Sequence, residues 1–67
     1  MKAGIYMDDW KKPIFERHLR LNGYAWTEGP GLDEGTVLLI VHTDNITALE
    51  VVVRAANKEA AQTGAPL

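Results

Sequence analysis

The sequence predicts a single α+β domain in which strands and helices follow one another in the order β-α-β-β-α. The main observation is the pattern of apolar residues, which is strand-like over three short segments and recurs at helical spacing over two longer ones. A cluster of Gly and Pro residues separates the second and third strands. The 67 residues have room for one domain, residues 1–67, of which residues 62–67 are expected to form a frayed tail.

The three predicted strands differ in their patterns. Residues 2–7 alternate, with Ala3, Ile5 and Met7 on one side. Residues 24–28 contain two aromatic residues and a Thr, which favour strands. Residues 36–43 give the strongest strand signal, an apolar run that is followed by Asp and Asn. The segment from residue 29 to residue 35 is expected to be a long hairpin loop.

Two helices are predicted, over residues 12–22 and 46–61. Pro13 fits the first turn of the first helix, and either Lys12 or Asp9 is its N-cap. In the second helix Thr47 and Glu50 have the spacing of a capping box, although Asp44 or Asn45 could supply the cap instead. The stripes expected to face the core are Ile14, Phe15, His18 and Leu19 in the first helix and Leu49, Val52, Val53, Ala56 and Ala60 in the second.

This order of elements also predicts a topology. A right-handed crossover followed by a hairpin places both helices on one face of a three-stranded sheet, with the third strand in the centre. The plan resembles the ferredoxin-like, split β-α-β arrangement without its last strand. One side of the first strand is then an open edge, at which another chain could pair.

The predicted central strand is apolar on both sides. Val37, Leu39 and Val41 point one way, whereas Leu38 and Ile40 point the other. Two helices on one face can cover only one of these sets, and an apolar sheet face in water is a liability. We therefore expect a homo-oligomer that forms through the open sheet face or edge, with Leu38, Ile40 and Tyr6 at the interface.

Composition argues against several classes of function. The chain has no Cys and no Ser, so thiol, zinc-thiolate and serine chemistry are excluded, and no metal-ligand spacing is present. We predict no catalytic residue, no metal site and no cofactor. The net charge of −2 with mixed signs indicates no nucleic-acid partner, and no apolar run is long enough to cross a membrane. No segment has the pattern of a signal peptide, so a cytoplasmic location is expected.

A few residues could still carry chemistry. His18 and His42 are the two histidines, and each is expected to be a partly buried structural residue. Asp8 and Asp9 follow the first strand, where two adjacent carboxylates could serve acid–base chemistry or bind a cation, but capping and turn formation explain the pair more simply and are what we expect. The Gly-rich loop is not followed by a helix, so it lacks the dipole that a phosphate cradle uses.

Three hypotheses about function follow from these residues. The first is a non-enzymatic homo-oligomeric binding or accessory protein. The second is a small-molecule-binding or enzymatic oligomer whose pocket lies between sheet faces and is lined by His42, Tyr6 and Trp26. The third is a subunit of a hetero-complex.

Overall fold

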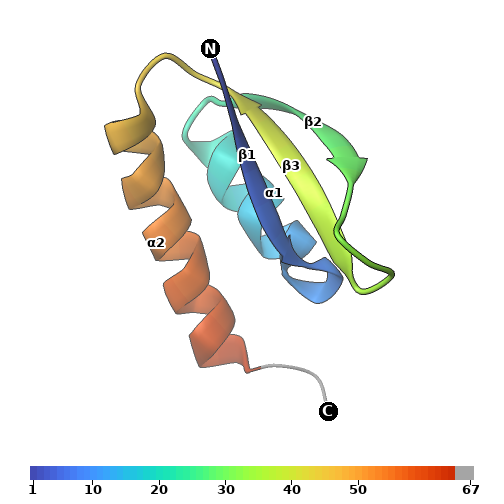
Figure 1. Cartoon of the computed structure of the whole chain (residues 1–67). Coiled ribbons are helices and arrows are strands. Elements are labelled where there is room, and N and C mark those ends of the chain that lie inside the picture. The colour runs from blue at the N-terminus through green and yellow to red at the C-terminus, as the bar shows by residue number, and fades with distance from the viewer. Residues whose placement is uncertain (65–67) are drawn as a thin grey trace.

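The computed structural model describes residues 1–64 and confirms the α+β fold with the order β-α-β-β-α (Figure 1). A short 3-10 helix, η1, precedes the first α-helix. The elements are β1 (Lys2–Asp8), η1 (Asp9–Lys11), α1 (Lys12–Leu21), β2 (Ala25–Pro30), β3 (Thr36–His42) and α2 (Ile46–Thr63). Helix α2 continues past residue 61, where the sequence pattern predicts its end, and residues 65–67 of the predicted tail lie outside the described residues.

The three strands form one open antiparallel sheet in the order β1-β3-β2, with the third strand in the centre as the split β-α-β plan predicts. Ile5 lies opposite Leu39 in the β1–β3 pairing, and Trp26 lies opposite Val41 in the β2–β3 pairing. Figure 1 shows α1 behind the sheet and α2 alongside it. Both helices contribute to the core on one face of the sheet, so no helix of residues 1–64 lies over the other face.

The core lies between the helices and the odd-numbered residues of the central strand. Leu39 and Val41 of β3 are both 0% exposed. Around them pack Met7 of β1, Phe15 and Leu19 of α1, and Leu49, Val52 and Ala56 of α2. Because successive residues of a strand point to opposite faces, this arrangement directs Leu38 and Ile40 away from both helices.

The beginning of α1 differs from both N-caps that the sequence suggested. The chain leaves β1 through η1, and α1 begins at Lys12 with Lys11 in the N-cap position and no side-chain capping hydrogen bond. Pro13 therefore stands within the first turn, where its missing N–H breaks no helical bond. The 3-10 turn explains why neither Asp9 nor Lys12 is the cap of α1.

The loop between β2 and β3 is held by hydrogen bonds to the Thr36 side chain and needs a glycine at position 31. Thr36 Oγ1 accepts hydrogen bonds from the backbone N–H groups of Leu32, at 2.8 Å, and of Asp33, at 3.0 Å. Gly31 lies against the backbone of Thr36, so closely that a Cβ at this position would be 2.0 Å from the Thr36 carbonyl oxygen. Only a residue without a side chain fits there without moving the loop.

Candidate functional site

The face of the sheet that the helices leave uncovered is the candidate site. The strand register arranges its side chains in four rows across the sheet. From one end to the other, the rows are Lys2, His42 and Ala25; Gly4, Ile40 and Thr27; Tyr6, Leu38 and Gly29; and Asp8 and Thr36. The two middle rows are uncharged, and the charged residues stand in the outer rows. We call this surface the open face.

The centre of the open face is apolar and has few side chains on its outer strands. The Leu38 side chain lies between two glycines: a Cβ on Gly4 would be 3.1 Å from Leu38 Cδ1, and a Cβ on Gly29 would be 3.2 Å from Leu38 Cδ2. Leu38 and Ile40 are consequently half-buried within their own sheet. Gly4 and Gly29 thus make room for the branched side chain of Leu38, which spreads over both neighbouring strands.

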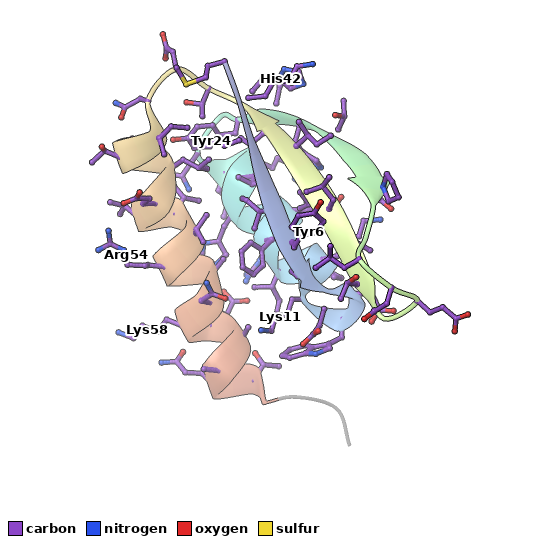
Figure 2. All side chains as sticks on the ribbon, in the orientation of Figure 1. Tyr6, Lys11, Tyr24, His42, Arg54 and Lys58 are labelled. Atoms are coloured by element: carbon purple, nitrogen blue, oxygen red, sulfur yellow. The ribbon has the colours of Figure 1, made fainter. Side chains whose placement is uncertain are left out.

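Tyr6 lies on the open face, as the predicted interface requires. Its side chain stands next to Leu38 in the same row and is 53% exposed (Figure 2). Other exposed apolar residues, such as Leu21, Leu32 and Val51, lie on helices or in a loop rather than on the sheet. Isolated exposed apolar residues are ordinary in folded proteins, whereas neighbouring ones on one face suggest a contact surface.

The structure does not bring together the three residues of the hypothetical ligand pocket. His42 and Tyr6 both lie on the open face (Figure 2), but two rows apart with the row of Gly4 between them, which is about 13 Å at ~3.3 Å per strand residue. His42 is exposed, whereas the sequence predicted a partly buried residue. Trp26 lies opposite Val41 on the helix-covered face and packs against the core. Its Nε1 donates a hydrogen bond to Glu16 of α1 at 3.3 Å, so its polar group has a partner within the protein.

The other polar clusters join elements of the fold to one another. Glu59 of α2 accepts a hydrogen bond from Arg17 of α1 and lies 3.0 Å from His18 Nε2. Lys12 forms an ion pair with Glu28 of β2, and the hydrogen bond and negative charge of Glu28 raise the pKa of Lys12 above 10.5. His18 is therefore a structural partner of α2, consistent with its expected role.

The charges at the two ends of the open face have no such partners. Within residues 1–64, the side chains of Lys2 and Asp8 take part in no ion pair and no hydrogen bond. Both residues are exposed, and they stand at opposite ends of β1. Asp33 and Glu34 add exposed carboxylates at the Asp8 end.

The outer edge of β1 presents free backbone groups. Thr43 N donates to the Met1 carbonyl at 3.0 Å, and Asp9 N donates to the Gly35 carbonyl at 2.9 Å. In an antiparallel ladder such pairs recur at every second residue, so the odd-numbered residues of β1 bond to β3. The N–H and C=O groups of the even-numbered residues point outward, among them those of Gly4 and Tyr6.

Residues 1–64 contain no cavity large enough to count as a pocket. In the same part of the chain, no three His, Asp or Glu side chains are grouped so that they could hold a metal ion. Neither of the described α-helices is both long and apolar enough to cross a membrane. The surface with the clearest potential for a contact is therefore the open face.

No protein-family model, no curated protein and no solved structure matches this chain.

The sequence pattern places Gly4 on the same side of the first strand as Tyr6, but it did not identify Gly4, Gly29, Lys2 or Asp8 as part of the candidate interface. Their importance depends on the register, which decides the residues beside Leu38 and those in the outer rows. The alternation of Lys2, Gly4, Tyr6 and Asp8 along β1 is a signal that could have shown that they share a face.

Proposed function

We propose that this protein is a non-enzymatic, homo-oligomeric binding or accessory module whose copies associate through the open face. In this proposal the chain is a cytoplasmic, ferredoxin-like module without the last strand, and it needs no cofactor or nucleic acid. The observation that carries the proposal is the two-sided apolar character of β3, the central strand, which has helices on one side only.

The expected strength of the association depends on how much apolar surface of Leu38, Ile40 and Tyr6 a second copy can bury. Removing apolar surface from water contributes about 25 cal/mol per Å². The face measures roughly 23 Å along seven-residue strands and ~14 Å across three strands. This is a few hundred Å² per copy, less than the ~800 Å² per partner of a stable complex, so a weak, concentration-dependent association is expected.

The face is a better candidate than the β1 edge. The edge offers backbone hydrogen bonds, but the charged residues Lys2 and Asp8 stand at its ends, and charges on an edge strand oppose pairing with another chain. The face offers apolar side chains that no helix in the described part of the chain covers. The separation of Trp26 from Tyr6 and His42 gives the ligand-pocket hypothesis no geometric support.

The test is the solution mass of the whole chain, measured by sedimentation velocity and light scattering from micromolar to millimolar concentration. We expect a reversible monomer–dimer equilibrium. Replacing Ile40 by Lys places a charge in the middle of the open face and should abolish the dimer. The matched control is Val51→Lys, because Val51 is 60% exposed on α2.

A monomer at every concentration would contradict the proposal. So would a dimer that Val51→Lys disrupts as strongly as Ile40→Lys does. Circular dichroism of each variant checks that the fold is retained, and Ile40→Thr provides a milder second variant if the Lys variant does not fold.

A further inference from the structure

The sizes and charges of the side chains on the open face also favour one relative orientation of two associated copies. We infer that two copies stack face to face with their strands antiparallel, so that Lys2 of each copy lies near Asp8 of the other. The inference rests on the proposed function and adds the partner's orientation and the residues that fix it.

The first observation is that the face has opposite charges at its two ends. Lys2 and His42 share the first row, whereas Asp8 stands in the last row, with Asp33 and Glu34 in the loop beyond it. Asp44, two residues past His42, is an acidic group near the basic end. The side chains of Lys2 and Asp8 have no partner within residues 1–64, so both are available to a second copy.

Closed pairs of identical subunits are related by a two-fold axis, which for two stacked sheets can lie in either of two directions. An axis along the strands places like ends together, so the lysine ends meet. An axis across the strands places each basic end over an acidic end, because it reverses the direction of β1. Complementary charge favours this second arrangement, since like charges in contact suppress association.

The second observation is that the same axis pairs Tyr6 with a glycine and pairs the two apolar residues of β3 with each other. An axis across the strands, midway between the two middle rows, places Tyr6 of one copy over Gly4 of the other and Leu38 over Ile40. On the β2 side it places Thr27 over Gly29. The Tyr6 ring, which is 53% exposed, would thus lie over Gly4, where the Leu38 side chain of the other copy is the nearest apolar contact.

The geometry of stacked sheets is compatible with these contacts. Twisted sheets pack about 10 Å apart with their strands offset by ~30°, which moves the end rows sideways by a few ångströms. The Lys side chain is long and flexible enough to compensate for this shift. No helix obstructs the approach, because the helices that form the core lie on the other face.

The experiment uses two single charge reversals in the full chain, Lys2→Glu and Asp8→Lys. Each places like charges at both symmetric contacts, so each alone should raise the dimer dissociation constant about tenfold. The Asp8 side chain makes no capping hydrogen bond to η1, so its replacement leaves the local fold unchanged. Lys58→Glu is the matched control, because Lys58 is exposed on α2 and points away from the sheet (Figure 2).

Mixing the two single variants gives the decisive result. In a mixed dimer Glu at position 2 faces Lys at position 8, and the native Lys2 faces the native Asp8. An equimolar mixture should therefore associate with nearly the wild-type dissociation constant, and so should the double variant. The Lys58→Glu protein should behave as wild type, and added salt should weaken the wild-type dimer.

The outcomes separate this inference from the proposed function. A wild-type dimer whose single variants are not rescued by mixing would overturn the antiparallel orientation and leave the open-face dimer standing. Single variants that associate as wild type would do the same. A wild-type chain that stays monomeric would overturn both.

Discussion

At the scale of single residues, Gly23 has a backbone conformation that other residues rarely adopt. It follows the end of α1 with φ of 78°, and nothing lies within 4 Å of a Cβ built there. Gly23→Ala should therefore destabilise the protein by about 1 kcal/mol through backbone strain alone, because the left-handed region costs L-residues 1–2 kcal/mol. Chemical denaturation with the two-state equation measures this free energy of unfolding.

Gly35→Ala is the matched control for that substitution. Gly35 has no positive φ, and the nearest atom to an added Cβ is Asp33 Oδ1 at an ordinary 3.7 Å. Alanine there should leave the stability unchanged or raise it by a few tenths of a kcal/mol, since it restricts the unfolded chain. Equal losses at both positions would show that the conformation of Gly23 is not the cause.

At the scale of elements, the stability of α2 depends on its N-cap, for which the sequence suggested Asp44, Asn45 or a Thr47–Glu50 capping box. Asn45 Oδ1 accepts a hydrogen bond from Ala48 N at 3.0 Å, so Asn45 is the N-cap. Asn45→Ala should lower the free energy of unfolding by about 1 kcal/mol. Thr47→Ala, at a position of the first turn whose side chain makes no hydrogen bond in the described chain, should change it by only a few tenths. A loss at Thr47 as large as that at Asn45 would instead favour the capping box.

The existence and type of every strand and α-helix could be predicted from the sequence, because apolar periodicity follows which face is buried. Their ends were less predictable. The η1 turn before α1 was missed, since Asp9 and Pro13 suit several kinds of helix start. Strand β2 was predicted to end at Glu28 but continues to Pro30, which is tolerated because β2 is an edge strand and needs no N–H at that position.

At the scale of the whole molecule, the association of copies should be visible in thermal unfolding. A ligand or partner that binds only the folded chain stabilises it by mass action, so the Tm of the wild-type protein should rise with protein concentration. The Ile40→Lys protein should lose this dependence, because it cannot bury the open face. Differential scanning calorimetry over a concentration series measures both. A Tm that does not vary with concentration in the wild type would argue against the dimer.

The open face itself was only partly predictable. The unbroken apolar run from Val37 to Val41 shows that β3 is apolar on both sides, whichever strands lie next to it. The face of Trp26 was not predictable, because it depends on the pairing of β2 with β3 and on the Glu16 side chain that accepts its hydrogen bond. A one-residue change in that register would have turned Trp26 to the opposite side.

The contact between Gly31 and Thr36 has a consequence for how the sequence can vary. In a library that samples every amino acid across the loop, position 31 should accept glycine alone, because a Cβ there would meet the Thr36 carbonyl at 2.0 Å. Leu32, which is 74% exposed, should accept almost any residue. Two adjacent positions would thus differ sharply in the substitutions that they accept. A search for distant homologues could require glycine at the position that aligns with Gly31.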